Sequence, residues 1–227
     1  MCGRYTLTAP GQLVFDEFDL HGEVPRIEPR YNVAPSQLVV VVGARPGAPG
    51  PTVARMRWGF SLSGGKRVIN ARRETLAERP LFRRAFAERR CLVVADGFYE
   101  WKPEGGAKQP YYVRLGDRPL FAFAGLWRRA PSDDAPSEAG EAPVVHECVI
   151  ITAPSSGGVR DLHDRMPVVV PRARYAEWLD PSERDLRRLA RMLDETPADA
   201  FELRPVSTLV NSPRNDGPEC VAAVAAS

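Results

Sequence analysis

The sequence predicts a single domain of the α+β or mainly-β class. Short strand-like runs recur along the 227 residues, whereas few segments show the periodicity of a helix. Strands and helices do not alternate as a parallel βαβ sheet requires, and the chain contains no internal repeat. A chain of this length can bury a substantial core, and one domain is the simpler interpretation.

The first quarter of the chain predicts three strands and one helix. Residues 4–8 alternate between polar and apolar side chains, as a short strand does. Residues 8–22 open with Thr-Ala-Pro and close with His-Gly, which indicates a helix. After an irregular segment at 25–35, the apolar run 37–42 predicts a buried strand, and residues 52–58 predict another whose alternate residues face opposite sides.

The middle of the chain predicts a helix and a set of hairpins. The helical pattern covers residues 74–90, with a break at Pro80 and a strongly basic end. Residues 91–95 are continuously apolar and predict a buried strand. Glycine-containing connections bound the runs 111–115 and 120–127, which is typical of antiparallel hairpins.

The last third begins with a segment, 129–143, that is rich in Pro, Ser, Ala and acidic residues. Because it lies between two strand-like runs, we interpret it as a flexible loop insertion within one domain. Three strands and two helices are expected beyond it: strands at 144–152, 168–170 and 201–207, and helices at 172–180 and 182–194, the second capped at Pro181-Ser182.

The composition is that of an ordinary soluble globular protein, with 44% hydrophobic and 26% charged residues. No charged-then-apolar leader opens the chain, and no apolar run reaches the roughly 18 residues of a membrane span, so a cytoplasmic protein without membrane contact is expected. The four cysteines form no C-x-x-C pair, and there are only three histidines. We therefore expect no metal, no cofactor and no disulfide framework.

Arginine makes up nearly all of the 31 basic residues, since lysine stands only at 66, 102 and 108. Arginine is suited to bidentate phosphate contacts and to stacking on bases, which is compatible with a nucleic-acid partner. A GC-rich coding sequence would produce the same bias, together with the abundant Ala, Pro and Gly. Composition alone does not establish nucleic-acid binding.

Cys2 becomes the N-terminal residue whenever Met1 is removed. It then carries an amine and a thiol on adjacent carbons, a 1,2-aminothiol. The amine has a reference pKa of about 7.7–8, so part of it is neutral and nucleophilic near neutral pH, and the thiol titrates near about 8.5. Together they can trap an aldehyde, the amine as an imine and the sulfur by closing a thiazolidine. The alternative interpretation is a small buried residue at the start of a strand.

Two polar residues have sequence neighbours that favour a role in catalysis or ligand binding. Glu100 lies between Tyr99 and Trp101, and a carboxyl held against aromatic rings loses solvation, which raises its pKa toward the range useful for acid–base catalysis. Alternation along a strand would instead turn Glu100 outward. Asn70 follows two β-branched residues, so it either orients a polar ligand at a strand end or closes a turn.

His163 lies in a turn flanked by Asp161, Asp164 and Arg165, just before an apolar strand. A histidine with acidic neighbours can shuttle protons near neutral pH, and the alternative is a solvated surface group.

Other residues have the chemistry to hold a nucleic acid. Arg4, Arg72 and Arg73 are suited to phosphates, and Trp58 is suited to stacking on a base. None of them identifies a ligand by itself.

The pieces are more specific in combination, because six motifs follow one another in a fixed order. They are Met1-Cys2-Gly3-Arg4-Tyr5, Tyr31-Asn32-Val33-Ala34-Pro35, Trp58-Gly59-Phe60, Asn70-Ala71-Arg72-Arg73-Glu74-Thr75, Arg90-Cys91-Leu92-Val93-Val94-Ala95-Asp96-Gly97-Phe98-Tyr99-Glu100-Trp101 and Leu162-His163-Asp164-Arg165-Met166-Pro167. This series resembles the SOS response-associated peptidase (SRAP) family. The resemblance covers residues 2–220 and leaves 221–227 as a tail.

The resemblance implies one α+β domain with a barrel-like, mainly antiparallel β core, flanking helices and a basic groove. It implies a protein that captures abasic sites in single-stranded DNA during the DNA damage response. The N-terminal Cys2 would form a reversible thiazolidine crosslink that shields the lesion. The family is also credited with removing its own Met1, hence the peptidase name. A monomer is expected, in the cytoplasm and on the nucleoid when bound to DNA.

Site residues are implied position by position. Cys2 matches the crosslinking residue, Asn70 the amide that hydrogen-bonds the linkage, and Glu100 the acid–base carboxylate near the amine. His163 matches the histidine that assists sugar ring opening and crosslink reversal. The implied DNA-binding residues are Arg4, Pro35, Trp58, Arg72, Arg73 and Arg165, with Trp58 as a base-stacking wall.

The chain departs from the family pattern after Trp58-Gly59. Family members often carry Pro and a second Trp there, whereas this chain reads Ser61-Leu62-Ser63-Gly64-Gly65, predicted as a flexible connection. We expect weaker affinity for undamaged single strands, with crosslinking retained.

Two other functions compete with this one. The first is a cysteine peptidase that acts in trans through Cys2, with His163 and either Asn70 or Glu100. The second is a non-enzymatic module that binds single-stranded DNA or RNA, whose binding would be reversible, salt-sensitive and independent of Cys2.

Overall fold

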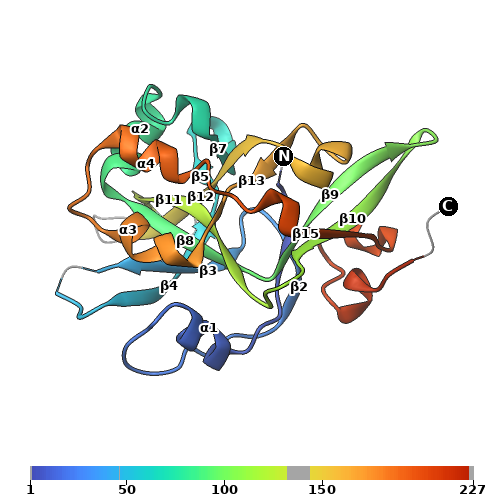
Figure 1. Cartoon of the computed structure of the whole chain (residues 1–227), viewed down its shortest axis with the longest axis horizontal. Coiled ribbons are helices and arrows are strands. Elements are labelled where there is room, and N and C mark those ends of the chain that lie inside the picture. Colours follow the sequence, from blue (N-terminus) through green and yellow to red (C-terminus); the bar gives the residue numbers. More distant parts are fainter. Residues whose placement is uncertain (1, 46, 132–143, 225–227) are drawn as a thin grey trace.

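Five strands close into a barrel at the centre of the protein (Figure 1). The computed structural model describes residues 2–45, 47–131 and 144–224. In order around the barrel the strands are β12 (Val144–Pro154), β4 (Pro51–Trp58), β3 (Leu38–Ala44), β8 (Arg90–Ala95) and β11 (Phe121–Pro131), which pairs with β12 again. All of these pairings are antiparallel except that between β12 and β4.

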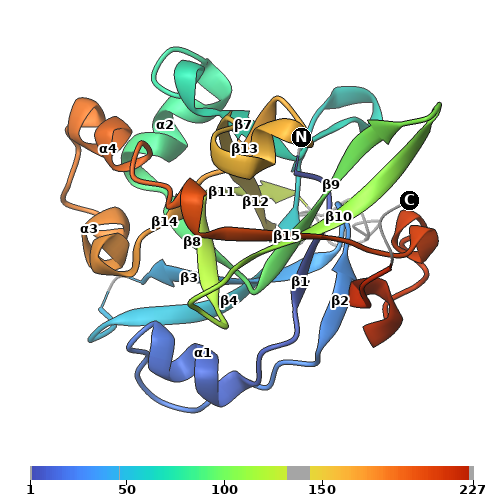
Figure 2. The same cartoon turned by 45° about the vertical axis from the view of Figure 1, so that its right-hand side comes forward.

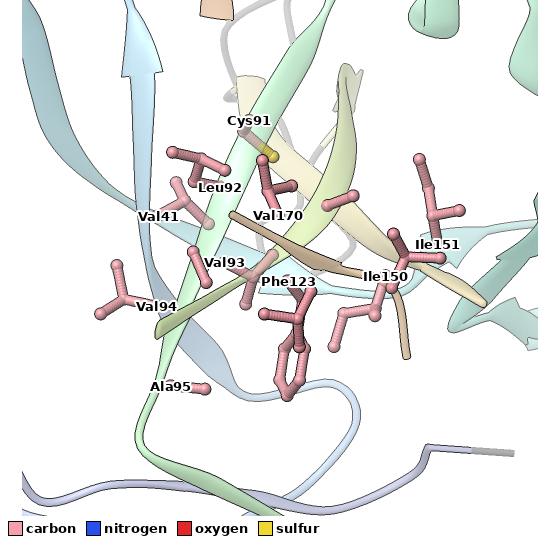
Figure 3. Close-up of a cluster of buried hydrophobic side chains, with 14 of the residues drawn as sticks. Val41, Cys91, Leu92, Val93, Val94, Ala95, Phe123, Ile150, Ile151 and Val170 are labelled. Atoms are coloured by element: carbon pink, nitrogen blue, oxygen red, sulfur yellow. The ribbon is translucent and has the colours of Figure 1, made fainter. Parts of the chain in front are cut away.

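The barrel interior explains the continuous apolar runs of the sequence. Every residue of β8 is buried, because one face of this strand lies in the barrel and the other is covered by helices. Figure 3 shows side chains from five different strands meeting in this core. The labelled residues are Val41, Cys91, Leu92, Val93, Val94, Ala95, Phe123, Ile150, Ile151 and Val170.

A second, five-stranded sheet lies against the barrel (Figure 2). Its strand order is β15 (Phe201–Pro205), β10 (Ala107–Leu115), β9 (Gly97–Glu104), β1 (Tyr5–Leu7) and β2 (Arg30–Val33). Strands β9 and β10 form a hairpin across Gly105 and Gly106, which both have positive φ. This sheet carries the N-terminal strand between β9 and β2.

Within the described residues, four helices flank the sheets: α1 (Gly11–Glu17), α2 (Pro80–Glu88), α3 (Tyr175–Leu179) and α4 (Leu186–Met192). Short strands and 3₁₀ turns complete the fold. The strands are β5 (Phe60–Ser61), β6 (Arg67–Val68), β7 (Asn70–Arg72), β13 (Arg165–Pro167) and β14 (Val169–Val170), and the turns are Ser63–Gly65, Arg73–Thr75, Gly157–Asp161, Arg172–Arg174, Ala198–Ala200, Thr208–Asn211 and Pro218–Val221. No helix within the described ranges has the length and apolar character needed to cross a membrane.

The predicted fold class is confirmed, and several element boundaries are corrected. Pro80 begins α2 and does not interrupt a longer helix, because proline lacks the N–H that the first helical turn leaves unpaired. Asp185 caps α4 in place of the predicted Ser182, since its carboxylate accepts the N–H groups of Arg187 and Arg188.

Three segments predicted to be irregular are partly ordered as strands. The segment 25–35 contains β2, and the connection 61–66 is a turn between the paired strands β5 and β6. The predicted loop 129–143 is shorter at its start, because β11 and β12 stay in register up to Pro131 and Val144. Residues 132–143 lie outside the described residues.

Candidate active site at the N-terminal strand

A buried carboxylate holds the N-terminal strand in place. Asp96, at the turn between β8 and β9, accepts hydrogen bonds from the hydroxyls of Thr6 and Thr8. It also accepts the backbone N–H groups of Thr8 and Ala9. These donors all lie on the segment that follows Cys2. Asp96 therefore fixes the start of the chain against β9.

The glycine after Asp96 allows this close packing. A Cβ atom on Gly97 would lie 2.2 Å from the phenol oxygen of Tyr112, so only glycine fits. Two residues further along β9, the backbone N–H of Tyr99 donates to the carbonyl of Arg4 at 3.0 Å. The sheet hydrogen bonds thus continue to Arg4, two residues from Cys2.

Cys2 and Glu100 are both buried, with 0% and 1% of their surfaces exposed. Burial raises the pKa of the Cys2 thiol and the negative charge of Glu100 raises it further, while the positive amino terminus and the backbone N–H of Arg4 oppose these effects. Burial also raises the pKa of Glu100 to about 7. The carboxyl is therefore divided between its two protonation states at neutral pH, which is the condition for general acid–base catalysis.

A pocket of about 470 Å³ brings Glu100 together with His163. Its lining residues are Glu100, Trp101, Lys108, His163 and Asn211, from β9, β10, the loop before β13 and a C-terminal 3₁₀ turn. In Figures 1 and 2, β9 and β13 lie on either side of the segment that leads into β1. The carboxyl and the imidazole predicted from the sequence thus face one pocket.

The backbone around His163 is held rigidly. Its N–H donates to the carbonyl of Val159 at 3.1 Å, and its carbonyl accepts the hydroxyl of Ser155. The imidazole Nδ1 accepts the backbone N–H of Arg165 at 2.9 Å and lies 2.7 Å from a carboxylate oxygen of Asp164. Burial lowers the pKa of His163, so the ring is mostly neutral at pH 7.

Asn70 carries a buried amide that is unsatisfied within the structure. Neither its amide nitrogen nor its amide oxygen has a hydrogen-bond partner among the described residues. Leaving such groups unpaired costs about 1–3 kcal/mol each, which suggests that they are kept for a ligand. Strand β7 pairs Asn70 with Ile150 and Arg72 with Thr152 of β12, while β13 pairs Pro167 with the same Thr152. Asn70 therefore lies beside the end of β12 that pairs with β13, the strand that follows the His163 loop.

The arginines predicted to bind phosphate differ in their availability. Arg72 is exposed. Arg165 is nearly buried and donates two hydrogen bonds to the carboxylate of Glu74, and Arg73 pairs with Asp194. Arg165 and Arg73 thus already have anionic partners, and Arg72 is the one presented to solvent.

Arg4 helps to anchor the C-terminal segment. Its guanidinium donates to the amide oxygen of Asn32 at 2.9 Å and to the carbonyl of Val210 at 2.7 Å. Asn32 is fully buried, and its amide nitrogen donates to the carbonyls of Val210, Ser212 and Asn215. This role of Asn32 was not predicted, because residues 25–35 were expected to be irregular and strand β2, which contains Asn32, emerges only in the structure.

The stacking role predicted for Trp58 is wrong in this structure. Its ring is 0% exposed, its indole N–H donates to the carbonyl of Ile69 at 3.0 Å, and it packs edge-on against Tyr5. No face of the ring is open to a base. Pro35 is half-buried in the turn after β2, and its predicted role in DNA binding stays a prediction.

Three pocket residues were not predicted as site residues: Trp101, Lys108 and Asn211. The indole N–H of Trp101 donates to the amide oxygen of Asn211 at 2.7 Å, which joins β9 to the C-terminal turn. The sequence showed Trp101 only as an aromatic neighbour of Glu100. Lys108 and Asn211 reach the pocket from distant segments, so the sequence did not predict their presence there.

Comparison with known proteins identifies the family. The family profile described as SOS response associated peptidase (SRAP) matches residues 1–213. The chain is 36% identical to "Abasic site processing protein YoqW" of Bacillus subtilis (strain 168), over 97% of this chain and 99% of that protein. It is 31% identical to "Abasic site processing protein YedK" of Escherichia coli (strain K12), again over 97% and 99%.

Solved structures agree in fold. A phage-related protein from Bordetella bronchiseptica superimposes with a TM-score of 0.72 at 31% identity, over 91% of this chain and 95% of that one. A protein from Bacteroides thetaiotaomicron reaches a TM-score of 0.79 at 21% identity, over 99% and 100%, a likeness of fold alone. The chain belongs to the SOS response-associated peptidase (SRAP) family.

Proposed function

We propose that this protein captures abasic sites in single-stranded DNA by a covalent crosslink through Cys2, after removal of Met1. The observation that carries the proposal is the burial of Cys2 beside Glu100, a carboxyl with a pKa of about 7, at a pocket shared with His163. Relatives named as abasic site processing proteins support the substrate class.

The first chemical step is imine formation. An abasic site exists partly as a ring-opened aldehyde, and the neutral α-amine of Cys2 attacks its carbonyl carbon. The amine loses two protons, the carbonyl oxygen leaves as water, and a C=N bond forms. Glu100 suits both proton transfers, because with a pKa of about 7 it can accept a proton from the amine and return one to the leaving hydroxyl.

The second step closes the thiazolidine. The sulfur of Cys2 adds to the imine carbon, the thiol proton passes to the nitrogen, and a five-membered ring forms. The thiol attacks a carbon to which it is already tethered, so a low thiol pKa is not required. The raised pKa of this thiol is therefore compatible with crosslinking. The overall reaction joins aldehyde and aminothiol and releases one water.

Three other residues have roles in this scheme. The imidazole of His163 assists opening of the sugar ring and, in reverse, release of the crosslink. The unsatisfied amide of Asn70 supplies hydrogen bonds to the linkage and the sugar remnant. The exposed Arg72 is the strongest candidate for a phosphate contact.

The trans-acting peptidase receives less support. A cysteine nucleophile of that kind works as a thiolate and needs a lowered pKa. Burial and the charge of Glu100 act on Cys2 in the opposite direction. Removal of Met1, by this protein or by a separate aminopeptidase, remains a required earlier step.

A denaturing gel tests the proposal. The protein is incubated with a single-stranded oligonucleotide that carries one abasic site, beside the same strand without the lesion and beside Cys2→Ala. We expect a shifted band that survives denaturation only with the lesion and the wild-type protein, and an intact mass equal to protein plus DNA minus one water. No shifted band, from protein whose Met1 is shown to be absent, would refute the proposal.

A further inference from the structure

The Nδ1 nitrogen of His163 contacts two groups that require opposite protonation states of that nitrogen. The backbone N–H of Arg165 donates to Nδ1 at 2.9 Å, which requires a lone pair there. A carboxylate oxygen of Asp164 lies 2.7 Å from the same Nδ1, which is favourable only when that nitrogen carries a proton. A single nitrogen cannot carry a proton and offer a lone pair at the same time. The two contacts therefore correspond to two different tautomeric arrangements of the ring.

The two arrangements give Nε2 different chemistry. When Nδ1 accepts from Arg165, the neutral ring keeps its proton on Nε2 and cannot act there as a base. When Nδ1 donates to Asp164, the neutral ring has its lone pair on Nε2 and can accept a proton there. Protonation then gives an imidazolium that can return the same proton from Nε2, with Nδ1–H still bound to the carboxylate.

We propose that Asp164 is a positioning residue that selects the Nδ1–H tautomer of His163 and so lets Nε2 alternate between acid and base. Asp164 itself has 84% of its side chain exposed and does not line the pocket, so it acts through the imidazole. This inference rests on the proposed function, in which His163 assists opening of the sugar ring and release of the crosslink, two steps that move a proton.

The local backbone favours such a contact. The carbonyl of Asp164 accepts the N–H of Ser155 at 3.0 Å, and the neighbouring His163 is bound through its own N–H and carbonyl. The backbone of Asp164 is therefore held beside the ring, with its carboxylate within reach of Nδ1. In contrast, Asp161 also flanks His163 in sequence but ends the preceding 3₁₀ turn.

Other charges act on the same ring. Glu100 of β9 lines the pocket with it, and Lys108 of β10 lowers the pKa of His163, as does the positive charge of the amino terminus. The Arg165 guanidinium is paired with Glu74. Asp164 is the carboxylate among these that touches Nδ1, and it raises the pKa of His163 against the cations.

Nitrogen NMR of the full-length protein, without DNA, tests the inference directly. The chain has only three histidines, so His21 and His146 serve as internal references, and a His163→Gln spectrum assigns the third ring. In the wild type we expect a substantial Nδ1–H population for His163 above its pKa. In Asp164→Ala we expect the Nε2–H tautomer, with the titration midpoint lower by roughly half a pH unit, as for a solvent-screened ion pair.

Two variants control the experiment. Asp164→Glu keeps a carboxylate and should restore part of the Nδ1–H population, whereas Asp161→Ala removes the same charge elsewhere and should leave the ring unchanged. The rate of crosslink reversal should fall about tenfold in Asp164→Ala and recover in Asp164→Glu. Identical ring spectra in the wild type and Asp164→Ala would overturn the inference. A wild-type protein that forms no crosslink would refute the proposed function, while the spectra would still decide the role of Asp164.

Discussion

Replacing Glu100 with glutamine should make the protein more stable at alkaline pH and much less active. Glu100 is almost completely buried, and burial raises its pKa from 4.5 to about 7. In the unfolded chain the same carboxyl ionises near its ordinary pKa. Folding at high pH must therefore bury a charge that water would solvate, and glutamine removes this cost while it keeps the shape of the side chain.

The magnitude follows from the two pKa values. A difference of about 2.5, from 4.5 to about 7, corresponds to on the order of 3 kcal/mol, at about 1.36 kcal/mol per pKa unit. Between these pH values the folded state binds more protons than the unfolded state, so the free energy of unfolding falls as pH rises. Below pH 4.5 the cost is absent, and above pH 7 it is complete.

Urea denaturation at pH 5 and pH 8 measures this effect. The stability of Glu100→Gln relative to the wild type should rise by about 2–3 kcal/mol between the two pH values. Over the same range, the rate of crosslinking to an abasic oligonucleotide should be lower in the variant by about 10²–10⁴-fold. If the stability difference between the two proteins is the same at both pH values, the reasoning is wrong.

Glu147→Gln is a matched control with the opposite expectation. Glu147 is as buried as Glu100, but it pairs with Arg67 at 2.9 Å and Arg128 at 2.8 Å. Burial opposes ionisation there, yet the bonds from Ser61 and the two arginines hold the pKa below its ordinary value. Removing this charge should destabilise the protein by about 3–5 kcal/mol at both pH 5 and pH 8.

Three other substitutions test the parts that support the site. Asp96→Ala removes the acceptor that holds the N-terminal strand and should lower the free energy of unfolding by about 2–4 kcal/mol in urea denaturation; an unchanged midpoint would contradict its structural role. Asn32→Ala removes the hydrogen bonds that bind the segment after Val210, so amide hydrogens there should exchange faster while those of β8 stay protected. Leu62→Trp adds an aromatic ring at a position that is 39% exposed and should strengthen binding to undamaged single strands by about 1–3 kcal/mol; equal affinities across a salt titration would rule this out.

Local patterns in the sequence predicted much of the fold. The apolar runs at 37–42 and 91–95 led to the barrel strands β3 and β8, in which residues 39–42 and 91–95 are buried, because a strand covered on both faces favours apolar residues at every position. The Gly105-Gly106 pair marked the hairpin of β9 and β10. The same local logic failed at Pro80, since one proline is compatible with either the interruption or the start of a helix.

The sequence by itself also determined the reactive group, because a cysteine at position two forms a 1,2-aminothiol after removal of Met1, whatever fold the chain adopts. The tertiary structure alone decided which residues meet it. Burial of Glu100 beside Cys2, the shared pocket with His163 and the enclosure of Trp58 all arise where the second sheet packs against the barrel. Periodicity reports which side of a strand is apolar. It carries no information about which distant segment covers that side, and this contact sets both the solvation and the pKa of a polar residue.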